Sequence, residues 1–335
     1  MKRYTYFVGT DVSRNKLDHA VKKNDTLLFH KETANNSTAI GDFISELKAL
    51  EGFKIGKTLF CIEDTGFYSN HMLNGLRKVK ANFISESSTK IRNSMGNVRN
   101  KSDKIDAIRI AEYAFRFQDK VTLWKPKRPI IAQLAYLNTL RERMSGLHLT
   151  IKMPLKEQSS FMKKTDCIKC ESLCNASIQA TKADIERIEK AISTLVESDS
   201  SINHLMKVIT SIPAVGPVTA LNIIIATNEF KDINNPKKFA CYSGVAPFVK
   251  ESGKFKGKPR VSHMANKRLK GLLHLCAMVA KKVVPEIAAY YKRKTGEGKN
   301  PMSVLNAIRN KLIMRIFACV NKNKSYTNFC PVPSN

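Results

Sequence analysis

Four acidic residues lie where the expected secondary structure could bring their carboxylates together. Asp11 ends the first expected strand, and Glu63 ends another strand that is apolar throughout, as strands buried on both faces are. Asp103 and Asp106 are three residues apart, which places them on one face of an expected helix. Several close carboxylates repel one another and ionise together only when divalent cations neutralise them. The pattern predicts a pocket for two Mg²⁺ ions, or Mn²⁺, clamping the attacking and leaving oxygens of a phosphodiester.

Asp64 competes with Glu63 for a place in this pocket. Residues in a strand alternate between its two faces, so only one of these neighbours can point into the site, and we expect it to be Glu63. Any single acid could be an ordinary surface residue. It is the combination, in this element order, that favours a metal site.

Ser252 is a second candidate for chemistry. It precedes Gly253 and stands at the head of a basic run that alternates along residues 253–261, as in an extended segment with its charges on one face. A cationic setting would attract a phosphate and stabilise the charge that develops while the hydroxyl attacks. From the residues alone, a simple Ser-Gly turn remains the alternative. The basic run consists of Lys254, Lys256, Lys258 and Arg260.

The elements that must position the acids come in a definite order. Hydrophobic periodicity and turn residues predict a strand, a hairpin of two further strands, and then helix, strand, helix, strand and helix. This is the order of an RNase-H-like α/β domain. The expected elements are residues 4–11, 16–22, 26–31, 37–50, 58–62, 71–78, 81–85 and 103–117.

A helical connector is expected after the prolines of a linker over residues 124–129. From there to about residue 206 the chain is expected to be nearly all helical. Isoleucines recur every seven residues, and a second apolar series with the same spacing is offset by three, which is the a/d pattern of a coiled coil between helices or subunits. A helix packed on its own domain is the alternative. The two series are Ile178, Ile185 and Ile192, and then Ile188, Leu195, Ile202 and Ile209.

The last region is expected to be mainly helical. Residues 212–220 read as the turn of a helix-hairpin-helix element, in which Gly216 permits a tight backbone and the next helix offers free N–H groups to a DNA phosphate. A turn without a ligand is the alternative. Residues 263–282 and 301–321 are expected to form two closing helices.

Charge favours a polyanionic partner. The 335 residues carry a formal net charge of +29, and residues 206–335 alone hold 23 basic and 5 acidic residues, as expected of a nucleic-acid-binding domain. No apolar stretch is long enough for a membrane span. Eight scattered cysteines suggest a reducing cytoplasm, and zinc at Cys167, Cys170 and Cys174 is disfavoured because no fourth ligand lies nearby.

Several motifs resemble those of one family. The segments YFVGTDVS (6–13), IEDTGFY (62–68) and KSDKIDA (101–107) are similar to the N-terminal signature of the insertion sequence 110 family of DEDD transposases, relatives of the Piv DNA invertases. The segments IPAVGPVTA (212–220), FACYSGVAP (239–247) and ESG (251–253) resemble that family's second domain. The resemblance covers essentially the whole chain.

The resemblance implies a RuvC-like catalytic domain over residues 1–123, a connector over 124–206 and a transposase domain over 207–335. Asp11, Glu63, Asp103 and Asp106 would bind Mg²⁺, and Ser252 would form a transient phosphoserine bond to DNA. It further implies a homo-oligomer, a dimer or tetramer, and guidance by a structured RNA from the element. Such an enzyme would work in the prokaryotic cytoplasm, at the nucleoid.

We therefore expect an enzyme that cuts and rejoins DNA as a transposase, with a Piv-like invertase as the alternative. Nucleic-acid backbones would be held by Lys254, Lys256, Lys258, Arg260, Lys267 and Arg268. One rival is a metal-dependent nuclease of the Holliday-junction type, in which water attacks and Ser252 is only a turn. Another is a non-catalytic basic binding protein, against which the four acids speak.

Overall fold

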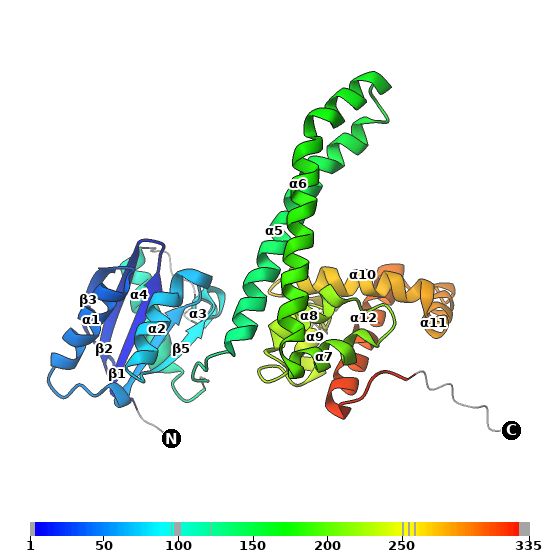
Figure 1. Ribbon diagram of the computed structural model, residues 1–335. Helices are drawn as coiled ribbons and strands as arrows, with labels where there is room; N and C mark the ends of the chain where they lie inside the picture. The colour runs from blue at the N-terminus through cyan, green and yellow to red at the C-terminus, as the bar shows by residue number, and fades with distance from the viewer. Residues whose placement is uncertain are drawn as a thin grey trace. The chain divides into compact units, whose positions relative to one another are not determined.

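The structure is a computed structural model that describes residues 4–94, 96, 102–120, 122–249, 251–253, 255–257 and 259–327, with the backbone alone at 255 and 256. Contacts divide the chain into two compact units, Met1–Pro126 and Lys127–Asn335 (Figure 1). The expected connector belongs by its contacts to the second unit from Lys127 onward. The three-part division of the chain remains a prediction.

The first unit is built on a five-stranded sheet in the order β3-β2-β1-β4-β5. The first three strands form an antiparallel meander, and β4 and β5 run parallel to β1. The central strands β1 and β4 are buried almost throughout, which explains their continuous apolar sequence. The strands are β1 (Tyr6–Val12), β2 (Lys16–Lys23), β3 (Thr26–Ala34), β4 (Thr58–Glu63) and β5 (Asn82–Glu86).

Helices cover both faces of this sheet. Residues of α1 and α2 share one core with alternate residues of β1 and β4, and α4 shares a second core with the residues in between. Two short 3₁₀ turns, Ile55–Lys57 and Gly66–Ser69, flank β4. The helices are α1 (Ser37–Ala49), α2 (Asn70–Lys78), α3 (Ser88–Ser94) and α4 (Asp103–Arg116).

Helix α4 lies directly against β1. A Cβ added at Gly9 would stand 2.2 Å from the backbone nitrogen of Ala111 and 2.4 Å from the carbonyl oxygen of Ala107. The absence of a side chain at Gly9 therefore allows helix and strand to touch, two residues before Asp11.

The eight elements expected in this unit are confirmed, with bounds that differ by at most three residues. Helix α3 was not expected, because seven residues with a single buried side chain, Ile91, leave too little periodicity to detect.

The second unit begins with two long helices, α5 (Pro129–Gln158) and α6 (Lys164–Glu197), which form an antiparallel hairpin (Figure 1). The base of this hairpin packs into one large core with the helices that follow. These are α7 (Ser200–Thr210), α8 (Pro217–Thr227), α9 (Pro236–Tyr242), α10 (Lys267–Val283), α11 (Pro285–Gly296) and α12 (Pro301–Lys322). The second unit is therefore mostly helical.

The expected heptad seam is wrong in its second half. Helix α6 ends at Glu197, and the carboxylate of Asp199 accepts a hydrogen bond of 3.0 Å from the backbone N–H of Ile202, which caps a new helix, α7. The series that runs to Ile209 therefore crosses a helix boundary. Whether α5 and α6 make a coiled coil with other copies remains a prediction.

The two expected closing helices are confirmed as α10 and α12, but a third helix, α11, lies between them. Pro285 stands at its first turn, where a missing N–H costs nothing. Among the residues described, no helix is long and apolar enough to cross a membrane.

Candidate carboxylate site

Asp11 and Glu63 lie at the same end of two neighbouring parallel strands. Gly9, two residues before Asp11, faces α4, and Cys61, two residues before Glu63, shares a core with α4. Because side chains two apart along a strand share a face, Asp11 and Glu63 both point to the α4 side of the sheet.

Asp103 and Asp106 lie in the first turn of α4. The hydroxyl of Ser102 accepts a hydrogen bond of 3.3 Å from the N–H of Ile105, and this cap begins the helix. Acids in the first turn are favoured by the positive end of the helix dipole. The local sequence thus presents two carboxylates at one helix end.

Electrostatics connects the four acids. The pKa of Asp11 is raised to about 6, first by burial and then by the negative charges of Glu63, Asp106 and Asp103, in that order. Each of the other three is therefore close enough to disfavour a charge on Asp11. The structure therefore gathers all four expected acids where β1 and β4 end and α4 begins.

Two cations also contact this group. The Nζ of Lys16 lies 2.9 Å from Oδ2 of Asp103, and Nη1 of Arg109 lies 2.8 Å from Oδ1 of Asp106. Within the described part of the chain, no three His, Cys, Asp or Glu side chains are arranged to hold a metal ion. The donor set still suits Mg²⁺, because all four groups are hard carboxylate oxygens whose repulsion a cation would relieve.

Sequence reasoning missed the residues that contact these acids. Lys16 begins β2, and Asp18, which is buried, pairs with Asp11 across the antiparallel ladder. The position of Asp18 could have been predicted from the expected hairpin, because directly paired residues of antiparallel strands share a face of the sheet. The i, i+3 spacing of Asp106 and Arg109 on the expected helix also held the information for their ion pair, whereas no local pattern relates Lys16 to Asp103.

Asp64 has a different position from Glu63. It follows the last residue of β4, and its Oδ1 accepts a hydrogen bond of 3.1 Å from the N–H of Gly66. That contact begins the turn toward α2, so the Asp64 side chain has a local structural role.

Ser252 lies in a small β arm of the second unit. Strand β6 (Pro247–Phe248) pairs with β9 (Arg260–Val261), and β7 (Glu251–Ser252) pairs with β8 (Phe255–Lys256). Ser252 is exposed, and Gly253 has a φ of +55°, which suits the tight turn that follows. The hydroxyl is therefore presented near the tip of the arm.

The expected nucleic-acid-binding cations are only partly described. Lys254 and Lys258 lie outside the described residues, and Lys256 is described by its backbone alone. Arg260 and Lys267 are exposed. Nε of Arg268 lies 2.9 Å from Oε1 of Glu142 on α5, so this cation already has a partner.

The turn between α7 and α8 differs from expectation in one respect. Gly216 has an extended conformation, with φ of −85° and ψ of 168°, which other residues adopt equally well. The left-handed residue is Ala214, with φ of +72°. The tight backbone therefore falls two residues earlier than predicted, and phosphate binding here remains a prediction.

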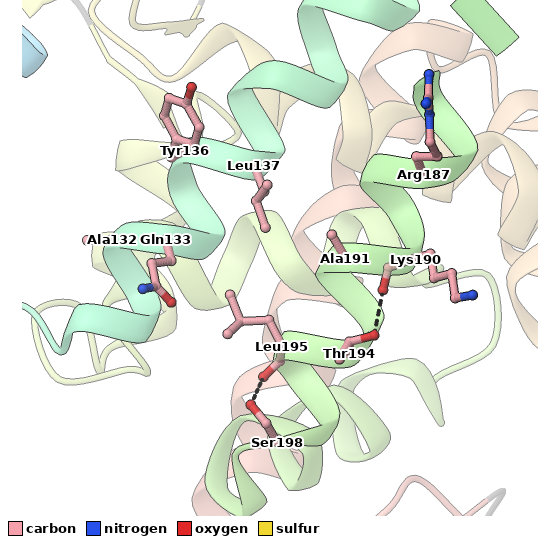
Figure 2. A pocket seen from close by; sticks show the side chains of 10 residues that line it. All are labelled: Ala132, Gln133, Tyr136, Leu137, Arg187, Lys190, Ala191, Thr194, Leu195 and Ser198. Carbon is pink, nitrogen blue, oxygen red and sulfur yellow. Dashed lines mark hydrogen bonds between the residues drawn. The ribbon is translucent and has the colours of Figure 1, made fainter. Parts of the chain in front are cut away.

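A groove of about 880 Å³ lies between α5 and α6 (Figure 2). Leu137, Ala191 and Leu195 contribute apolar surface, and Arg187 and Lys190 contribute charge. None of the four acids is among the described residues that line it.

Two family models match successive parts of the chain. A family model described as a transposase, of the DEDD type in the IS110 family, matches residues 8–156. A second model, described as the transposase IS116/IS110/IS902 family, matches residues 206–292. Together they span both the acids and the Ser252 arm.

Individual relatives show the same affiliation. The pilin gene-inverting protein of Moraxella bovis is 24% identical over 231 residues, which cover 68% of this chain and 69% of that protein. The pilin gene-inverting protein of Moraxella lacunata is 23% identical over the same length and the same shares of both chains. An uncharacterized 43.6 kDa protein of insertion element IS110 from Streptomyces coelicolor is 26% identical over 156 residues, 47% of this chain and 38% of that protein. The chain therefore belongs to the IS110 family of DEDD transposases and is a DNA transposase or recombinase.

Proposed function

We propose that this enzyme cuts and rejoins the DNA strands of an insertion sequence through a serine nucleophile assisted by divalent cations. The observation that carries the proposal is the position of Asp11 near the end of β1, where burial and then the charges of three further acids raise its pKa. The strand order β3-β2-β1-β4-β5, with one antiparallel meander and two parallel strands, supports an RNase-H-like fold for the first unit.

Asp11, Glu63, Asp103 and Asp106 would hold Mg²⁺ or Mn²⁺. When bound, such ions supply charge stabilisation to a phosphodiester undergoing in-line displacement. The protein's own contribution is to hold four carboxylates on two strand ends and one helix end, where their negative charges would attract the ions.

Ser252 would be the nucleophile. Its Oγ forms a bond to the phosphorus of the scissile phosphodiester, the bond from phosphorus to the leaving 3′ oxygen breaks, and the serine proton passes overall to that oxygen. The 3′-hydroxyl of a partner strand then attacks the phosphoserine and restores Ser252. The energy of the phosphodiester is kept in the intermediate, so no nucleotide hydrolysis is needed.

The remaining roles follow from the family and from charge. Lys254, Lys256, Lys258, Arg260 and Lys267 would hold nucleic-acid backbones, with Arg268 joining them if it leaves Glu142. We propose a homo-oligomer, a dimer or tetramer, guided by a structured RNA of the element. Site-specific inversion is the second candidate function, because the two Moraxella relatives are pilin gene-inverting proteins.

The test is to trap the covalent intermediate on nicked or synapsed element ends and to map it by mass spectrometry. We expect a DNA adduct on Ser252 that Ser252→Ala abolishes and that Ser262→Ala, a change just beyond the same arm, leaves intact. Strand cleavage without any adduct, undiminished in Ser252→Ala but lost in Asp11→Asn, would instead establish a nuclease that uses water.

A further inference from the structure

Lys16 is shared among three carboxylates from three elements. Its Nζ lies 2.9 Å from Oδ2 of Asp103 on α4, 2.9 Å from Oε2 of Glu32 on β3 and 3.4 Å from Oδ2 of Asp18 on β2. An ammonium group has three hydrogens to donate, so these contacts use its whole capacity. One of the three partners, Asp103, is a proposed metal ligand, and the other two are not.

The environment of the two other partners is suited to keep a cation. The Asp18 side chain is 5% exposed, and its Oδ1 lies 2.9 Å from Nε2 of His30. A carboxylate this buried is costly to leave without a positive or hydrogen-bonding neighbour. His30 contacts Oδ1 of Asp18, whereas Lys16 lies against Oδ2 and against Glu32, so Lys16 has a reason to remain with these two acids even when Asp103 binds another cation.

Lys16 and a divalent ion compete for the same carboxylate. The lysine side chain is 36% exposed and the Asp103 side chain 52% exposed, so both can rearrange without disturbing a core. A cation on Asp103 also offsets the repulsion among the acids while no metal is bound.

We propose that Lys16 is a tethered cation that neutralises Asp103 in the metal-free protein and moves wholly to Asp18 and Glu32 when a divalent ion binds. The inference rests on the proposed metal-binding role of the four acids. Lys16 is a positioning residue, since it acts on the ion through Asp103. When the ion is bound, Lys16 pairs only with Asp18 and Glu32.

The proposal predicts opposite effects for changes at Lys16 and at Glu32. Lys16→Met removes the competitor, so the Kd for Mn²⁺ should fall by roughly fivefold at most, as expected for the loss of one solvent-exposed ion pair. Glu32→Gln removes one of the two alternative ion-pair partners of Lys16. Lys16 should therefore hold Asp103 more tightly, and the Kd for Mn²⁺ should rise. The double variant should bind like Lys16→Met, because Glu32 acts on the ion only through Lys16.

The experiment is a titration of the full chain with Mn²⁺ alone, followed by electron paramagnetic resonance, with circular dichroism to verify folding. Arg14→Met is the matched control, since it removes the same charge from an exposed position two residues away. Lys16→Gln, which keeps a hydrogen-bond donor, is the second variant and should also lower the Kd. No DNA is present, so the readout does not depend on recombination.

The outcomes distinguish failure of the tethered-cation proposal from failure of the proposed metal site. If Asp11→Asn weakens Mn²⁺ binding but the Lys16 variants match the wild type or Arg14→Met, the tethered-cation proposal is wrong and the metal site stands. If Glu32→Gln still raises the Kd in the Lys16→Met background, its effect does not pass through Lys16 and the proposal is again overturned. If Asp11→Asn leaves Mn²⁺ binding unchanged, the proposed metal site itself fails.

Discussion

Glu63 and Asp64 are adjacent acids with different environments, and the difference favours Glu63 for the proposed metal site. Glu63 ends β4 on the face covered by α4 and raises the pKa of Asp11, whereas Asp64 accepts the N–H of Gly66 in the following turn. The hydrogen bond to Gly66 gives the Asp64 side chain a role in the turn toward α2. The pair therefore provides an internal comparison.

Replacement of Glu63 by Gln should reduce strand cleavage by about 10²–10³-fold, a loss typical of removing one electrostatic group that stabilises a transition state. Asp64→Asn should retain activity within a few fold, because an amide oxygen can still accept from Gly66. Cleavage assays on element ends check this. Equal losses for both variants, with native circular dichroism, would show that the strand does not select between them.

His19 is buried in the first unit, and we expect its burial to make the stability of the protein depend on pH. Its ring stacks on Phe43 with centroids 3.9 Å apart, and its two nitrogens lie 3.0 Å from the hydroxyls of Thr10 and Thr33. Burial, with smaller contributions from His30 and Lys31, lowers its pKa from 6.5 to about 3. The native chain therefore keeps this ring neutral where the unfolded chain protonates it.

The direction in which the free energy of unfolding changes with pH follows from the protons bound at His19 in each state. Between about pH 6.5 and pH 3 the unfolded state binds more protons at His19, so the free energy of unfolding falls as the pH falls through this window. From pH 7 to pH 5 the loss should approach about 2 kcal/mol. Urea denaturation at both pH values should show a smaller loss for His19→Gln. An identical loss in the variant would mean that His19 is not the responsible group.

The positions of the four acids can be predicted from the sequence better than the cations that pair with them. Strand ends and the i, i+3 rule place Asp11, Glu63, Asp103 and Asp106 from local pattern alone. The contact of Lys16 with Asp103 joins residues 87 positions apart and carries no periodic signal. Long-range ion pairs of this kind depend on how the elements pack, which one sequence does not display.

Gly9 shows how a whole element positions the site. Its missing side chain lets α4 approach β1, and α4 carries two of the four acids. An added methyl group would meet backbone atoms, which cannot move aside as a flexible side chain can.

Gly9→Ala should therefore destabilise the protein by about 2–3 kcal/mol, in the range of core overpacking, and should weaken Mn²⁺ binding by shifting Asp103 and Asp106. Gly41→Ala in α1 is the control, since nothing lies within 4 Å of its added Cβ. That change should stabilise the protein by about 0.5–1 kcal/mol, because alanine favours helix more than glycine does. Similar unfolding free energies for the two variants would contradict this account of the α4–β1 contact.

Periodicity located most of the elements but not where one helix gives way to the next. The isoleucine series continues through residues 197–200, although α6 ends and α7 begins there. The cap made by Asp199 is a short-range hydrogen bond that outweighs an uninterrupted apolar pattern. Helix α11 was missed for a related reason, since only Ile287 of its residues is buried.

For the whole molecule, the dominant property is a net charge of +29 with its excess in the last 130 residues. Each contact between a cation and a DNA phosphate releases counterions, so the affinity should fall steeply with salt. Replacement of Arg260 and Lys267 together by Ala should weaken DNA binding and reduce the slope of log K against log salt by about 2.

Filter-binding or anisotropy titrations at several salt concentrations measure this slope. Lys31→Ala is the control, because Lys31 lies in the first unit and pairs with Glu46. An unchanged slope in the Arg260 and Lys267 double variant would remove these two residues from the DNA interface.

The account of the whole molecule depends on the four acids of the first unit binding divalent ions, and crystals soaked in Mn²⁺ test this most directly. We predict an anomalous-difference peak contacted by Asp11 and at least one of Glu63, Asp103 and Asp106, at the ~2.1 Å of a small hard cation. The peak should disappear in Asp11→Asn crystals. Manganese bound only elsewhere, or no peak at these carboxylates at saturating Mn²⁺, would contradict the central claim.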